Sequence, residues 1–99
     1  MNLRILTEEI EEARKYFNRQ SRVLGRRFLD DLAASLAAIA EAPLRFPKLE
    51  TFPDDSPFRR ALLNVFRYSI IFEIVDHMAI VVAVSHCSRE PNYWLRPRL

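Results

Sequence analysis

The chain has 99 residues, 49% hydrophobic and 28% charged, which is typical of one globular domain and excludes a disordered or fibrous chain. Fifteen basic residues against thirteen acidic ones give a net charge of +2, too small an excess to indicate nucleic-acid binding by itself. The one cysteine, Cys87, excludes an intrachain disulfide, and the one glycine, Gly25, excludes glycine-rich phosphate loops. We therefore expect a single domain over residues 1–99.

Further patterns that the sequence lacks exclude other classes of protein. Residues 1–12 contain no apolar signal core, and no apolar run approaches the length of a membrane span. The sequence has no CxxC, no HExxH and no close His/Cys cluster, so we predict neither a metal site nor a cofactor. An unpaired cysteine is simplest to keep in a reducing compartment, and we expect a soluble cytoplasmic protein without membrane partners.

The first half of the chain predicts a strand followed by two helices. Residues 2–6 alternate apolar and polar side chains, which indicates a short strand. Thr7 suits the N-cap of a helix over residues 8–20, whose first turns are acidic and whose last turns are basic, as the helix dipole favours. After a turn at residues 21–25, an apolar stripe at helical spacing predicts a second helix that Pro43 ends.

The second half predicts a loop and then a sheet. Prolines mark residues 42–57 as a loop, and we expect its apolar side chains to be buried: Leu44, Phe46, Leu49 and Phe52. Segments rich in Ile, Val and Phe predict three antiparallel strands at residues 58–65, 68–75 and 79–86. Asp76-His77 can make the tight turn between the last two strands. The last strand, apolar on both faces, is expected to be central.

The predicted fold class is therefore α+β. Its order is β-α-α-β-β-β, with a helical hairpin packed on a small antiparallel sheet. Because the strands carry apolar residues on both faces, the sheet face away from the helices needs a cover or a partner.

A run of basic side chains at the helical turn is the first candidate site. We call it the basic tip, and it comprises Arg14, Lys15, Arg19, Arg22, Arg26 and Arg27. Such a patch can bind phosphates or an acidic peptide segment. The alternative, which the behaviour of most surface charges favours, is local pairing at i, i+4 spacing: Glu11–Lys15, Arg26–Asp30 and Arg27–Asp31.

Arginines and rings near the sheet provide further candidates. Arg59 and Arg60 must point to opposite faces of their strand, so one of them is available for binding. His86, Arg89 and Tyr93 can support phosphodiester cleavage by a ribose 2′-hydroxyl, since His or Tyr can move protons and Arg can stabilise the phosphate. In the alternative interpretation, His86 bonds its neighbours, Trp94 fills the core and Arg89 ties the tail to a carboxylate.

Several strings of residues resemble one known family. They are AVSHCSREPNYW at residues 83–94, followed by Arg96, YSIIFEI at 68–74, GRRF at 25–28 and the two prolines of PLRFP at 43–47. They resemble the ParE/RelE superfamily of bacterial toxins, which belong to type II toxin–antitoxin modules and are often labelled plasmid stabilisation proteins. The resemblance implies a growth-arresting toxin neutralised by a cognate antitoxin in a hetero-oligomer.

The resemblance leaves the cellular target open. The ParE-like branch inhibits DNA gyrase and is no enzyme, and the Pro91 and Tyr93-Trp94 pattern favours it. The binding residues would then be Arg22, Arg26, Arg27, Arg59, Trp94 and Arg96. The RelE-like branch is a metal-independent endoribonuclease that cuts mRNA on the ribosome, and its catalytic residues would be Arg60, His86, Arg89 and Tyr93. The third alternative is an inactive relative that only binds its antitoxin.

Overall fold

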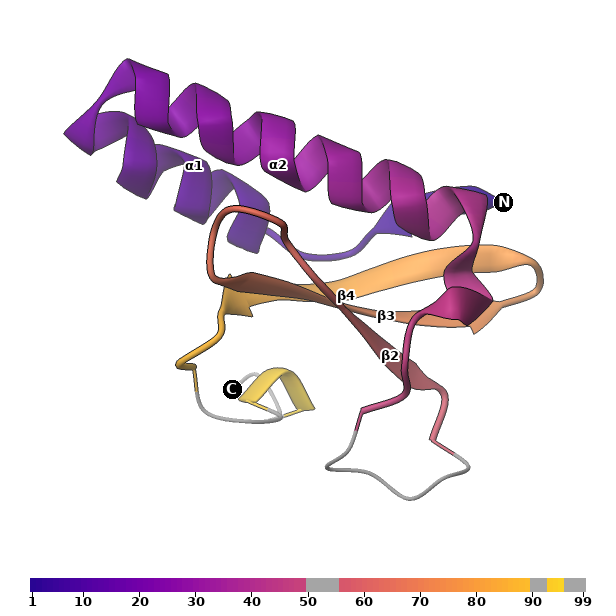
Figure 1. Ribbon diagram of the computed structural model, residues 1–99. Helices are drawn as coiled ribbons and strands as arrows, with labels where there is room; N and C mark the ends of the chain where they lie inside the picture. The colour runs from indigo at the N-terminus through magenta and orange to yellow at the C-terminus, as the bar shows by residue number, and fades with distance from the viewer. Residues whose placement is uncertain (50–55, 90–92, 96–99) are drawn as a thin grey trace.

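Two helices cover one face of a four-stranded sheet in the computed structural model, which describes residues 1–49, 56–89 and 93–95 (Figure 1). The regular elements, in chain order, are β1 (Asn2–Ile5), α1 (Glu9–Gln20), α2 (Arg22–Glu41), β2 (Phe58–Leu62), β3 (Tyr68–Val75) and β4 (Met78–His86). Two short 3-10 helices, η1 (Pro43–Arg45) and η2 (Tyr93–Leu95), follow α2 and β4. The predicted α+β class and the order β-α-α-β-β-β are confirmed.

The sheet has the strand order β1-β4-β3-β2. β2, β3 and β4 form the predicted antiparallel meander, and β4 lies inside the sheet as its apolar sequence indicates. β1 pairs with β4 in parallel, with Leu3 opposite Ala79 and Ile5 opposite Val81, so the sheet is mixed and not wholly antiparallel. The added strand satisfies backbone groups along an edge of β4 that would otherwise stay unpaired.

The turn between the helices is much shorter than predicted. Ser21 alone joins them: its N–H bonds Phe17 O at 3.1 Å, and its Oγ accepts the N–H of Leu24. The predicted turn at residues 21–25 is therefore wrong, and Gly25 lies within α2. A Cβ atom at Gly25 would lie 3.2 Å from the Asn18 Cα, so glycine lets α1 and α2 approach closely.

The start of α1 also differs from the expectation. Glu8, not Thr7, occupies the N-cap position and makes no side-chain cap. Thr7 Oγ1 accepts the N–H of Glu9 at 3.2 Å, so its hydroxyl still satisfies one of the unpaired N–H groups at the start of α1. No helix within the described ranges is long and apolar enough to cross a bilayer.

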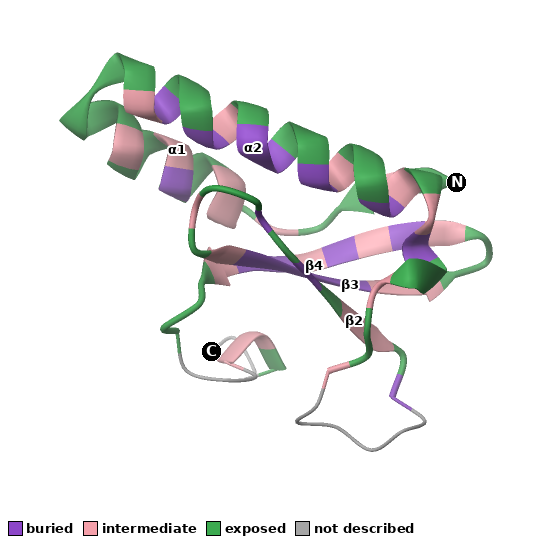
Figure 2. Cartoon of the chain, viewed as in Figure 1, coloured by how far each residue is buried: buried purple, intermediate pink, exposed green. Residues whose placement is uncertain are grey.

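The core lies between the helices and the sheet (Figure 2). Its largest fully buried side chains come from α2, β3 and β4: Phe28, Ile39, Ile70, Phe72, Val81 and Val84. Phe46 joins it edge-on to Phe72 at 5.8 Å, and Leu49 is half-buried. The expected burial of Leu44 is wrong, because this side chain of η1 is 71% exposed; Phe52 lies outside the described residues.

Contacts at the two ends of β3 explain where β2 ends and how β3 turns into β4. β2 ends at Leu62, not at the predicted residue 65, because the Asp31 carboxylate accepts the backbone N–H groups of residues 64–66 at 2.8–3.1 Å. At the other end, Asp76 and His77 have positive φ angles of 48° and 64°. Two successive positive φ angles are the conformation of a tight hairpin turn, as the sequence predicted.

Candidate functional site

η2, the described part of the C-terminal tail after β4, is fastened to the rest of the molecule through Glu9, in the first turn of α1. Because β1 ends opposite Val81, the N–H of Val84 has no strand partner on that side, and it bonds Glu9 Oε1 at 3.0 Å. The hydroxyl of Thr7 donates to the same oxygen at 3.1 Å. The hydroxyl of Tyr93 in η2 donates to Glu9 Oε2. One carboxylate thus joins α1, β4 and the tail.

The environment of Tyr93 keeps its phenol protonated. Burial, and then the hydrogen bond to Glu9, raise the pKa of Tyr93 from 10.0 to about 12. The Arg89 guanidinium lies 4.0 Å from the centre of the Tyr93 ring, a cation–π contact. Arg89 and Tyr93 are therefore held together, with the hydroxyl already engaged by a carboxylate.

η2 lies on the side of the sheet opposite the helices (Figure 1). The ring of Trp94 meets that of Phe58 at 4.6 Å and an interplanar angle of 70°. Alternation along β2 puts exposed Arg60 on the same face as Phe58, and Arg59 on the core side with Ala61. Arg59 is half-buried and donates from Nη1 to Phe46 O at 2.7 Å, which ties the preceding loop to β2.

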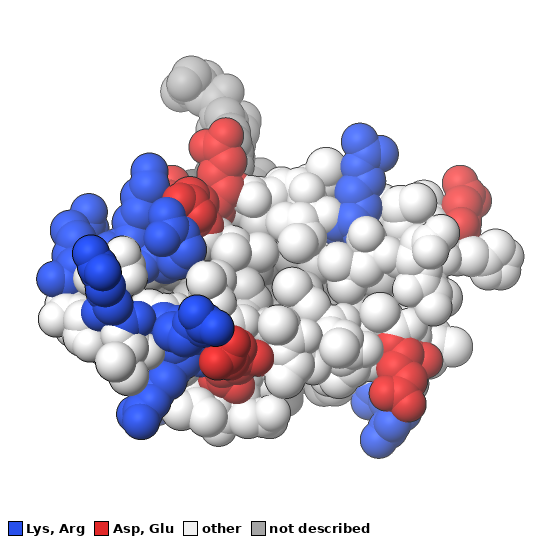
Figure 3. Space-filling model, turned by 90° about the horizontal axis from the view of Figure 1, so that it is seen from above, with Lys and Arg blue, Asp and Glu red and all other residues white. Residues whose placement is uncertain are grey.

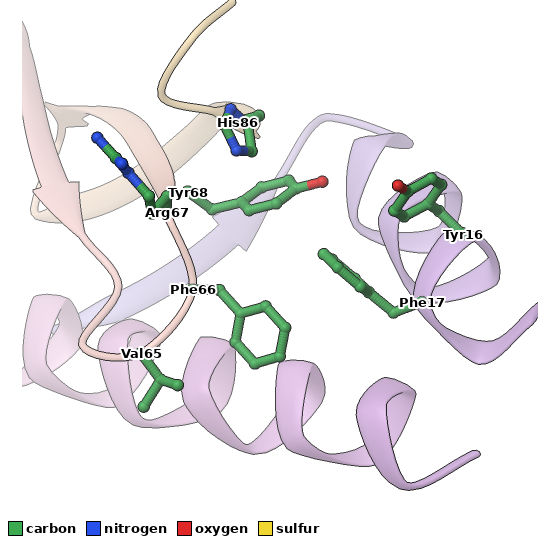
Figure 4. A pocket seen from close by; sticks show the side chains of 7 residues that line it. All are labelled: Tyr16, Phe17, Val65, Phe66, Arg67, Tyr68 and His86. Carbon is green, nitrogen blue, oxygen red and sulfur yellow. The ribbon is translucent and has the colours of Figure 1, made fainter. Parts of the chain in front are cut away.

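His86 lies at the end of β4, on the rim of a second feature. We call it the aromatic pocket: about 530 Å³, lined by Tyr16, Phe17, Val65, Phe66, Arg67, Tyr68 and His86 (Figure 4). His86 Nδ1 accepts the N–H of Ser88 at 3.1 Å, so the neutral ring carries its proton on Nε2. The imidazole packs edge-on against Tyr68 at 5.5 Å. Burial, and then Tyr16, raise the pKa of Tyr68.

A comparison with protein families identifies the class of protein. A family described as "ParE toxin of type II toxin-antitoxin system, parDE" matches residues 6–91. The chain belongs to this family of ParE toxins. A search of curated proteins found no match. The resemblance inferred from the sequence is confirmed, and a ParE-type toxin has a cognate antitoxin as its partner.

In this ParE toxin the basic tip gathers Lys and Arg side chains over the end of the helical hairpin (Figure 3). All six residues of the tip are exposed except Arg14, which is half-buried and forms an ion pair with Glu11. That contact lowers the pKa of Glu11. The expected pair of Arg27 and Asp31 has no counterpart, because the Asp31 carboxylate is buried and bonds the backbone after β2.

The four residues of the nuclease alternative are distributed over three places. Arg89 and Tyr93 lie together at Glu9, His86 contacts Tyr68 and Ser88 at the aromatic pocket, and Arg60 is exposed on β2. Arg96, a candidate binding residue, lies outside the described residues. Across the described ranges, no three His, Cys, Asp or Glu side chains come close enough to hold a metal ion.

Two residues of structural importance were missed from the sequence, Glu9 and Asp31. Glu9 looked like an ordinary first-turn acid, and no spacing distinguishes it from the three acids around it. Asp31 carried a signal: it follows Phe28 by three residues and precedes Leu32, so it falls on the apolar stripe of α2. A carboxylate on a core-facing stripe needs hydrogen-bond donors, and the nearest ones are in the backbone after β2.

Proposed function

We propose that this toxin is a ParE-like inhibitor of DNA gyrase that acts in the bacterial cytoplasm and is neutralised by its antitoxin. The observation that carries this choice over the mRNA nuclease is the contact between Tyr93 and Glu9. A catalytic phenol must face the phosphate and exchange its proton near neutral pH. Here the hydroxyl donates to a carboxylate and has a pKa of about 12, so Tyr93 suits a structural role.

The surroundings of Tyr93 support the same choice. A metal-independent cleavage needs its proton-transfer groups and its Arg within hydrogen-bond reach of one phosphate. The His86 imidazole instead contacts Tyr68 and Ser88, and the Arg89 guanidinium lies over the ring of Tyr93. The Glu9 carboxylate beside this pair repels a phosphate. A binding module is therefore favoured over an enzyme.

The basic tip is our proposed contact for antitoxin carboxylates. Arg22, Arg26 and Arg27 are exposed on the first turns of α2, with no acid in the sequence between Glu12 and Asp30. Arg26→Glu should weaken antitoxin binding about tenfold, and more at low salt, because an attractive charge becomes a repulsive one. Arg45→Glu, an exposed change in η1, is the matched control, and equal losses for the two variants would reject this contact.

The target is tested by expressing the toxin without antitoxin and following uptake of labelled thymidine and methionine. Gyrase inhibition predicts an early fall in thymidine incorporation with a DNA-damage response. An early fall in methionine incorporation alone, with cut messages, would overturn the proposal in favour of the nuclease. Unimpaired growth would indicate the inactive relative.

A variant sharpens the test of the target. Tyr93→Phe removes only the hydroxyl, so a gyrase inhibitor that remains folded should keep its growth arrest. A nuclease that uses this phenol should lose cleavage by about a hundredfold or more. A folded Tyr93→Phe protein that no longer arrests growth would count against the structural role of Tyr93.

A further inference from the structure

The aromatic pocket has features that the contacts within the chain do not use. Its volume of about 530 Å³ is in the range of ligand-binding pockets. Val65 and Tyr16 lie at opposite ends of the lining and are 75% and 51% exposed (Figure 4). Two large, exposed apolar side chains beside one cavity are typical of a surface that contacts another molecule.

The charge around the pocket defines what can bind there. Lys15 precedes Tyr16, Arg19 lies one turn further along the same face of α1, and Arg67 is part of the lining. The nearest acids on that helix are Glu11, which pairs with Arg14, and Glu12. An occupant with negative charge is therefore favoured by the field of the protein.

The polar groups inside the pocket are mainly hydrogen-bond donors. The hydroxyls of Tyr16 and Tyr68 face each other across the opening (Figure 4), and each phenol can donate one hydrogen bond. His86 has Nε2–H as its remaining donor, because Nδ1 accepts the N–H of Ser88. Backbone carbonyls or carboxylates of a bound chain would satisfy these donors.

The ring geometry favours a peptide over a nucleic acid. A stacked base needs a free aromatic face, and a sandwiched base needs two nearly parallel faces. Phe17 packs on Phe66 at an interplanar angle of 69° and on Tyr68 at 64°, so these rings face one another at steep angles. Exposed Val65 offers a base neither a face nor a hydrogen bond, but it can pack against an apolar side chain.

We propose that the aromatic pocket receives an apolar side chain of an acidic protein segment, whose carboxylates pair with Lys15, Arg19 and Arg67. This inference rests on the proposed function in one respect, since the partner that supplies the segment is the antitoxin. The buried apolar side chain provides most of the binding energy. The charges orient the segment and raise its rate of association with the toxin.

The test uses the purified toxin and the protein encoded by the adjacent reading frame, with affinity measured by calorimetry. Val65→Glu should lower the affinity at least tenfold, because it puts a negative charge at the pocket rim. Leu44→Glu is the matched control, since Leu44 is 71% exposed and lies on η1; it should change affinity less than twofold. Tyr16→Glu serves as a second pocket variant, and thermal unfolding confirms that each variant is folded.

The outcomes separate this inference from the proposed function. Wild-type binding that Val65→Glu and Tyr16→Glu leave intact would overturn the pocket and leave the antitoxin in place. Failure of the wild-type toxin to bind the neighbouring product would overturn both. A twelve-nucleotide RNA that displaces the partner, and whose own binding Val65→Glu abolishes, would reassign the pocket to nucleic acid.

Discussion

Two carboxylates of this toxin satisfy backbone N–H groups that the sheet leaves unpaired. Glu9 bonds the N–H of Val84, where β1 has ended, and Asp31 bonds three successive N–H groups in the link between β2 and β3. Each therefore takes the place of a strand partner just beyond the end of a strand pairing. Both acids lie on helices, so the same contacts also fix the helices on the sheet.

The role of Asp31 predicts a large effect of a small change. Asp31→Ala should lower the free energy of unfolding by about 3 kcal/mol, because three backbone donors lose a charged acceptor in a buried place. Denaturant titration of purified protein measures this value. Asp30→Ala is the matched control, because Asp30 is exposed, and it should stay within about 0.5 kcal/mol of wild type. Equal effects of the two substitutions would contradict the role of Asp31.

The phenol of Tyr93 predicts a dependence of stability on pH. Its pKa is raised from 10.0 to about 12 in the folded chain, so folding favours the protonated form. The stabilisation is complete below pH 10 and is lost as the pH rises toward 12. The difference in Tm between wild type and Tyr93→Phe should therefore shrink over that interval. A difference that stays constant from neutral pH to pH 12 would show that the hydroxyl does not stabilise the fold.

At the scale of the elements, the backbone of the tight turn between β3 and β4 is strained, and a substitution can relieve that strain. Asp76 and His77 both adopt positive φ, which glycine accepts at no steric cost and a bulkier residue does not. His77→Gly should raise the free energy of unfolding by about 0.5–1 kcal/mol. Calorimetric melting of the two proteins checks this, and a lower Tm for the glycine variant would refute the strain at His77.

Hydrophobic periodicity was sufficient to predict both helices, the meander and the central place of β4. Each of these depends on apolar spacing along a local segment. Most of the errors concern long-range contacts. Parallel pairing of β1 with β4 and the early end of β2 are set by partners many residues away. The single-residue turn at Ser21 is set locally, by its contacts with Phe17 and Leu24, and apolar spacing does not report such contacts.

The candidate site was predictable in composition but not in arrangement. The tail residues were recognised from their sequence, and the pairing of Arg89 with Tyr93 agrees with their closeness in the chain. The acid at the centre of the tail contact, Glu9, is 84 positions from Tyr93 and resembles its neighbours on α1. The aromatic pocket combines α1, the β2–β3 link and the ends of β3 and β4, so no single segment of the sequence reveals it.

At the scale of the whole molecule, the toxin presents two different surfaces. The basic tip and the aromatic pocket lie at the end of the molecule where the helical hairpin turns (Figure 3). η2 lies on the far face of the sheet (Figure 1). Positive charge and exposed apolar groups at the first surface suit an acidic protein partner. In our proposal, η2, with its tyrosine held by Glu9, serves recognition of a protein target and not proton transfer to RNA.

The central claim, that this ParE toxin acts on DNA gyrase by binding and not on mRNA by cleavage, is tested most directly with purified components. The toxin is added separately to a gyrase supercoiling reaction and to translating ribosomes carrying an end-labelled message. We predict loss of supercoiling, restored by the antitoxin, and an intact message. A cut message together with undiminished supercoiling would contradict the account.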